Sequence, residues 1–122
     1  MRLVEELVEL VPGESALCRR KTRSEDWYFQ GHFPDDPVVP AIVLIELLAQ
    51  TGGLAAASPG LSLRVASVGP FKFPAAARPN QLLEAHARIV GKAGGAFKID
   101  GEVLADGHRV ASGSVTLAES RR

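Results

Sequence analysis

Residues 40–57, with the sequence PAIVLIELLAQTGGLAAA, decide the fold of this chain. Pro40 suits the first position of a helix, and Ser58-Pro59-Gly60 ends one. Between them the residues are apolar on nearly every side, and a helix of that kind must be surrounded by protein. We therefore predict one long, buried helix from residue 40 to about residue 57.

The segments on both sides of this helix have the patterns of β-strands. Residues 3–11 fit either a helix or a strand by their periodicity, and we favour a strand because the Pro12-Gly13 turn follows them. Gly94-Gly95 forms a further turn, and Asp106-Gly107 is a strong hairpin signal. The predicted strands cover residues 3–11, 15–22, 62–73, 81–90, 96–104 and 109–118.

This order of elements predicts a single domain of the α+β class over residues 1–122. One apolar helix beside strands that are apolar on one face indicates a curved antiparallel sheet of about six strands wrapped around one long central helix. Such a sheet has exposed edges, which commonly pair with a second copy of the chain.

The composition is that of an ordinary globular protein, with 46% hydrophobic and 23% charged residues. Lys plus Arg and Asp plus Glu number 14 each, so charge gives no case for nucleic acid or an anionic membrane as partner. The apolar stretch of residues 41–57 is too short and too polar to span a membrane. Cys18 is the single cysteine and is expected to be a structural thiol. No signal-peptide pattern is present, so we expect a cytoplasmic protein.

Glu46 and Gln50 are polar residues inside the apolar helix. They are four positions apart and therefore lie on one helix face. An ionised carboxylate in apolar surroundings is costly unless it is paired or solvated. The pattern therefore fits a structural Glu–Gln hydrogen bond as well as an active-site carboxylate.

His32 differs from the other two histidines because it lies in the loop of residues 27–40, directly before the helix. His86 and His108 are expected at the surface, on the polar face of a strand and beside a turn. Three prolines exclude a helix from this loop and stiffen it: Pro34, Pro37 and Pro40. A histidine followed fourteen positions later by a carboxylate in an apolar helix is a candidate acid–base pair. The scattered histidines form no metal-binding motif.

The loop and the helix together resemble the signature of a known family. Residues 28–40, YFQGHFPDDPVVP, and residues 41–50, AIVLIELLAQ, are similar to the signature and central helix of the 3-hydroxyacyl-[acyl-carrier-protein] dehydratases. Phe71-Lys72 and residues 104–107, LADG, also match, so the resemblance covers essentially the whole chain. It implies the hot-dog fold, in which the sheet wraps the helix, and a homodimer with active sites between the subunits.

The resemblance also implies an activity, the removal of water from a 3-hydroxyacyl thioester on acyl carrier protein to give the trans-2-enoyl thioester. This reaction belongs to fatty-acid, polyketide or related lipid biosynthesis and needs no metal or redox cofactor. His32 of one chain would be the general base and Glu46 of the other the acid, while the Ala41 amide would stabilise the thioester oxygen. The implied substrate-binding residues are Gly31, Phe33, Pro40, Ala41, Gln50 and Phe71.

Three departures from the family pattern indicate a specialised relative of the housekeeping enzyme. Ala41 replaces a glycine, Leu47 replaces a small residue, and the helix that usually precedes the first strand is missing. Two alternatives stay open. One is a hot-dog thioesterase in which Glu46 directs water onto the thioester, and the other is a catalytically weak acyl-binding partner subunit.

The expected partners are an acyl carrier protein and a second copy of the chain, with a trimer of dimers as a further arrangement. An acidic carrier protein could dock on basic side chains, although charged strands are more often simply solvated. The candidates are Arg19, Arg20, Lys21 and Arg23, or Lys72 and Arg78.

Overall fold

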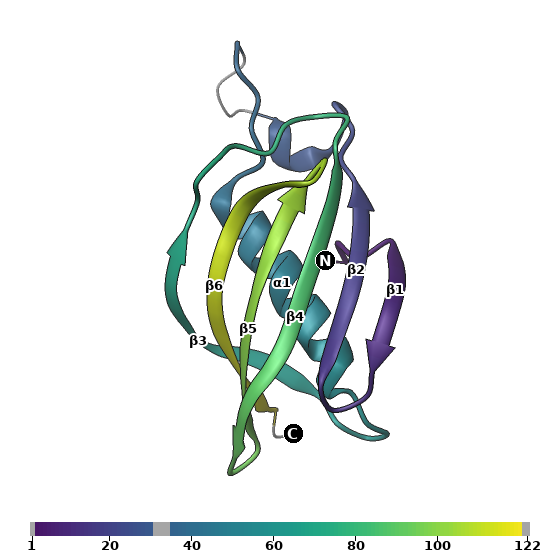
Figure 1. Cartoon of the computed structure of the whole chain (residues 1–122), viewed down its shortest axis with the longest axis vertical. Helices are drawn as coiled ribbons and strands as arrows, with labels where there is room; N and C mark the ends of the chain where they lie inside the picture. The colour runs from purple at the N-terminus through teal and green to yellow at the C-terminus, as the bar shows by residue number, and fades with distance from the viewer. Residues whose placement is uncertain (1, 31–34, 121–122) are drawn as a thin grey trace.

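The computed structural model describes residues 2–30 and 35–120 of the chain. One long helix, α1 (Ala41–Ala56), lies in the curve of a six-stranded antiparallel sheet with the strand order β1-β2-β4-β5-β6-β3 (Figure 1). The predicted fold class is therefore confirmed. The strands are β1 (Glu6–Val11), β2 (Ser15–Lys21), β3 (Leu63–Lys72), β4 (Leu82–Ala93), β5 (Ala96–Ala105) and β6 (His108–Glu119).

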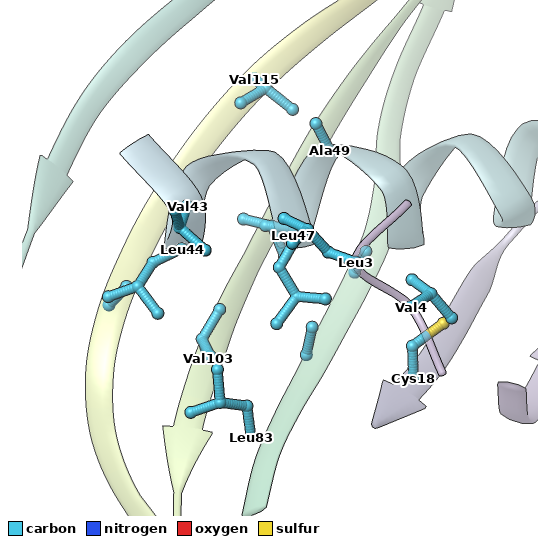
Figure 2. Close-up of a cluster of buried hydrophobic side chains, with 14 of the residues drawn as sticks. Leu3, Val4, Cys18, Val43, Leu44, Leu47, Ala49, Leu83, Val103 and Val115 are labelled. Atoms are coloured by element: carbon cyan, nitrogen blue, oxygen red, sulfur yellow. The ribbon is translucent and has the colours of Figure 1, made fainter. Parts of the chain in front are cut away.

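The core forms because apolar residues alternate along the central strands. On β4 and β5 most alternate residues are buried, among them Leu83, Ala85 and Ile99, whereas His86 is exposed. These side chains meet the buried face of α1, as Figure 2 shows for Leu83 and Val103 beneath the helix. Each large apolar side chain buried in this way stabilises the fold by about 1.5–3 kcal/mol. The helix residues in this core include Val43, Leu44, Leu47 and Leu48.

Two tight turns connect the last three strands, at the positions that the sequence predicts. Gly94 and Gly95 have φ angles of 56° and 77°, and Asp106 and Gly107 have φ angles of 48° and 84°. Two successive residues with positive φ match the right-handed twist of the strands that they join. The register of β4 with β5 and of β5 with β6 is therefore set locally.

Most element boundaries differ from the sequence prediction by one to three residues. The helix begins at Ala41, and Pro40 is its N-cap, whose carbonyl accepts the Val43 N–H at 3.0 Å. A short 3₁₀ helix, η1 (Trp27–Phe29), lies within the segment predicted as loop, because it precedes the first proline of that segment. The first strand begins at Glu6, since the residues before it turn inward under the helix.

The helix is only partly covered within one chain, although its apolar sequence predicts protein on every side. Ile42 is 68% exposed, because the sheet covers one side of α1 and leaves the opposite side open. The edge strand β3 is similarly uncovered, with Val65 39% and Val68 50% exposed. Apolar surface is thus present on the open side of the helix and on one edge of the sheet.

Candidate active site

Glu46 is half-buried on the side of α1 that the sheet leaves open. It follows the exposed Ile42 by four residues and precedes Gln50 by four, so the three side chains form one stripe along the helix. Leu44 and Leu48, on the opposite side of the helix, are buried. One face of this otherwise apolar helix therefore carries a carboxylate at its middle.

Gln50 connects this carboxylate to the start of the chain. Its Nε2 donates to Glu46 Oε1 at 3.1 Å, which confirms the pairing predicted from the spacing of the two residues. Its Oε1 accepts the backbone N–H of Leu3 at 2.8 Å and that of Val4 at 3.4 Å. One oxygen of Glu46 thus receives a hydrogen bond from a donor that is itself fixed in place.

Gly31, His32 and Phe33, three of the predicted site residues, lie outside the described part of the chain. The pairing of His32 with Glu46 therefore stays a prediction. The residues that flank this gap are anchored on both sides. Tyr28 and Phe29 are buried before it, and Val39, buried after it, donates its N–H to the carbonyl of Ala77 at 2.7 Å.

Asp26, Tyr28 and Arg20 form a part-buried polar group before the gap, here called the Tyr28 cluster, which the sequence did not predict. The Tyr28 hydroxyl donates to Asp26 Oδ2 at 2.6 Å and accepts from Arg20 Nε at 3.2 Å. Burial, and then the hydrogen bond to Asp26, raise the pKa of Tyr28 to about 12. Burial opposes ionisation of Asp26, but its hydrogen bonds to the Tyr28 hydroxyl and the Arg23 amide leave its pKa lowered. Arg20 lies eight positions before Tyr28 and on another element, so the sequence pattern did not show the cluster.

Pro40 and Ala41 lie together at the N-terminal end of α1, next to a small apolar hollow. The hollow has a volume of about 290 Å³, and Leu44 and Phe73 are among the residues that line it. The backbone N–H groups in the first turn of a helix have no acceptor within it, and they carry the positive end of the helix dipole. The backbone amide of Ala41, the predicted donor, therefore lies beside this apolar hollow.

Phe71 lies on β3, at the opposite edge of the sheet from β1. Its ring stacks on Phe73 with 5.9 Å between ring centroids and covers Gly113, where any side chain would collide with it. The helix packs mainly against β4 and β2. Within one chain, the structure therefore does not bring Phe71 together with Glu46.

A larger hollow lies on the outer face of the sheet, away from the helix. It has a volume of about 810 Å³ and is lined by polar residues such as His86, Asp100 and Glu102. His86 and His108 are both exposed, as predicted. Volume alone would therefore direct attention to the face that does not carry Glu46.

The basic cluster on and just after β2 is largely neutralised by acidic neighbours. Arg19 pairs with Glu84 at 2.9 Å, and Arg23 pairs with Glu5 at 2.7 Å. In the part of the chain that the structure describes, no three His, Cys, Asp or Glu side chains gather as a metal site. None of the described helices is long and apolar enough to cross a membrane.

A curved antiparallel sheet around one helix, with a carboxylate on the open side of that helix, defines a hot-dog-fold protein. Two solved structures have a similar fold. A chain of the dehydratase heterocomplex ApeI:P from Xenorhabdus doucetiae has a TM-score of 0.80 at 14% identity, over 99% of this chain and 84% of that one. A hypothetical thioesterase with coenzyme A from Streptococcus pneumoniae TIGR4 has a TM-score of 0.72 at 16% identity, over 96% of this chain and 86% of that one.

Sequence comparison identifies the family. Residues 1–114 match the FabA-like domain, and the chain belongs to that family. The 3-hydroxyacyl-[acyl-carrier-protein] dehydratase FabZ of Roseiflexus castenholzii is 31% identical over 115 residues, which cover 86% of this chain and 80% of that protein.

Proposed function

We propose that this chain dehydrates a 3-hydroxyacyl thioester carried on acyl carrier protein to the trans-2-enoyl thioester. The observation that carries the proposal is Glu46, oriented by Gln50 on the open side of the central helix of a FabA-like chain. Relatives named as dehydratases support the choice of reaction. We place the reaction in the cytoplasm, in fatty-acid or related lipid biosynthesis.

In the proposed reaction, His32 takes the proton from C2 of the substrate while the C3–O bond breaks. Glu46 supplies a proton to the departing hydroxyl, so water leaves and a double bond forms between C2 and C3. Because Gln50 donates to Oε1, the proton for the hydroxyl would be carried by Oε2. The amides of the first turn of α1, including that of Ala41, would stabilise the negative charge on the thioester oxygen.

We further propose that the catalytic unit is a homodimer. The open side of α1, with Ile42 68% exposed, and the β3 edge, with Val68 50% exposed, both carry apolar surface. A second copy of the chain would bury both and would bring another His32 to each Glu46. A β3 edge without a partner also offers a row of backbone groups to pair with another strand.

A thioesterase is the second candidate function. A carboxylate that accepts a fixed hydrogen bond is also suited to directing a water molecule onto a thioester carbonyl. The methyl group of Ala41, at the position where the family has glycine, would change how close the thioester can approach. Hydrolysis would release the free acid, whereas dehydration leaves the acyl chain on its carrier.

The test is to incubate the purified chain with 3-hydroxyacyl-carrier protein and to follow the products by mass spectrometry. We expect reversible loss of water, and Glu46→Gln or His32→Ala should each lower kcat at least about 10²-fold. His86→Ala is the matched control, because His86 is exposed on the outer face of the sheet. Release of free acid would favour the thioesterase, and dehydration that survives both substitutions would refute the proposed site.

A further inference from the structure

We propose that residues 3–5, here called the N-terminal segment, set the orientation of the Glu46 carboxylate, and that Arg20 is the positioning residue that holds this segment. The inference rests on the proposed function only in taking Glu46 as the reacting group. Arg20 lies on β2, 26 positions before Glu46 in the sequence, and makes its contacts to the N-terminal segment and to the Tyr28 cluster.

The Gln50 side chain has a fixed direction. The backbone N–H groups of Leu3 and Val4 can only donate, so the atom that faces them must be the carbonyl oxygen of Gln50. Its NH₂ group then points the other way, toward Glu46 Oε1 at 3.1 Å. Turning the amide over would set donors against donors and leave the Leu3 and Val4 amides without this acceptor.

The first residues of the N-terminal segment are buried. Leu3 is 1% exposed and Val4 is 7% exposed, and their side chains lie below α1 beside Leu47 and Cys18 (Figure 2). The amides that orient Gln50 therefore belong to a segment anchored in the core. The position of this segment, rather than Gln50 alone, decides which group faces the carboxylate.

Arg20 contacts this segment directly. Arg20 Nη1 donates to the carbonyl of Leu3 at 3.1 Å, and the Arg20 side chain is only 12% exposed. The same guanidinium donates through Nε to the Tyr28 hydroxyl and lies 3.5 Å from Asp26 Oδ1. A guanidinium with its donors in a fixed fork can hold two segments at a set separation, which a lysine cannot do equally well.

Arg20 thus joins two parts of the chain that lead to the candidate site. One part is the N-terminal segment, which orients Gln50 and through it Glu46. The other is the Asp26–Tyr28 pair, which stands four residues before His32 in the sequence. Loss of the guanidinium would leave the peptide of Leu3 and the hydroxyl of Tyr28 to move independently of each other.

The test compares Arg20→Met with Arg19→Met, both studied below the unfolding transition. Arg19 is the matched control, because its partner Glu84 is not part of the contacts to the N-terminal segment. In ¹⁵N-labelled protein we expect Arg20→Met to speed exchange of the Gln50 side-chain amide protons with water. Arg19→Met should leave that exchange unchanged.

Activity gives a second readout. Arg20→Met should lower kcat about tenfold with KM nearly unchanged, since a misplaced catalytic group slows the reaction without removing substrate contacts. Arg20→Lys keeps a donor for the Leu3 carbonyl and should restore part of both the amide protection and kcat. If Arg20→Met does not fold, Arg20→Lys carries the same amide measurement, and wild-type protection in that variant together with unaltered kcat would contradict the need for the fork.

Gln50→Glu separates the two halves of the contact. An ionised glutamate can accept the Leu3 and Val4 amides but, unlike the glutamine amide, has no hydrogen to donate to Glu46, so the N-terminal segment should stay in place while kcat falls. Unchanged Gln50 exchange in a folded Arg20→Met variant would overturn the inference. If the chain proved not to be a dehydratase, the exchange measurement would still decide whether Arg20 controls the Gln50 amide.

Discussion

Tyr28 is the single tyrosine of the chain, and its hydroxyl lies between Asp26 and Arg20. Burial and the hydrogen bond to Asp26 both favour its neutral form, which is why its pKa rises to about 12 from the ordinary value of 10.0. The folded state therefore holds this proton more tightly than the unfolded state does.

The consequence is a loss of stability at alkaline pH. Tyr28 contributes stability fully below pH 10.0, and this contribution is lost as the pH rises through the folded pKa of about 12. We expect the ultraviolet absorbance of tyrosinate to appear at higher pH in the folded protein than in denaturant. The unfolding free energy of Tyr28→Phe should fall less over this range than that of the wild type. Identical titrations in the folded and denatured protein would contradict the buried hydroxyl.

At the same scale, the sequence predicts part of the candidate site and not the rest. The contact of Glu46 with Gln50 follows from a spacing of four residues, which places both on one helix face. The contact of Gln50 with Leu3 spans 47 positions, and no periodicity connects them. The periodicity of residues 3–11 fits either a helix or a strand, so it did not show that the first residues of this segment turn inward.

At the scale of the elements, helix α1 contains two adjacent glycines, Gly52 and Gly53, although glycine is a poor helix former. A Cβ atom on Gly52 would lie 2.8 Å from the Cγ2 of Ile99, whereas one on Gly53 would lie 4.0 Å from the Cδ1 of Leu117. Ile99 is fully buried on β5, so it cannot move aside without disturbing the core. Gly52 is thus required by the close approach of helix and sheet, and Gly53 is not.

Alanine substitution should separate the two glycines. Gly53→Ala should raise the unfolding free energy by up to about 1 kcal/mol, because alanine is the better helix former. Gly52→Ala should lower it by about 1–3 kcal/mol through overpacking against Ile99. Chemical denaturation of the two variants measures both values, and equal effects would mean that the helix does not approach β5 as closely as described.

The elements that the sequence predicts well are those that local chemistry determines. The hairpins at Gly94-Gly95 and Asp106-Gly107 follow from residues that accept positive φ. The position of β3 beside β6 does not follow from either strand alone, because the pairing is set by how the whole sheet closes around the helix. The open side of α1 escaped prediction for a related reason, since an apolar helix does not reveal whether its own chain or another covers it.

For the whole molecule, the central expectation is that each site draws His32 from one chain and Glu46 from the other. Inactive His32→Ala and inactive Glu46→Gln chains should then restore activity when they are mixed and allowed to exchange subunits. Half of the dimers would be mixed, and each mixed dimer would keep one intact site of two. We therefore expect about a quarter of wild-type activity.

Activity assays after co-refolding measure this recovery, with each variant refolded alone as the control. No recovery in a preparation that contains mixed dimers would mean that both groups of a site come from the same chain. A mass of 13.0 kDa in solution, that of one chain, would argue against the dimer itself.

The pairing of β3 with β6 also sets an order of events during synthesis of the chain. β3 leaves the ribosome before the whole β4–β5 hairpin, yet its partner β6 is the last strand to be made. At ordinary elongation rates this delay is on the order of seconds, far longer than a hairpin needs to form. Through that interval β3 lacks its partner strand within the chain, so the time needed to translate residues 73–119 sets how long its pairing edge stays open.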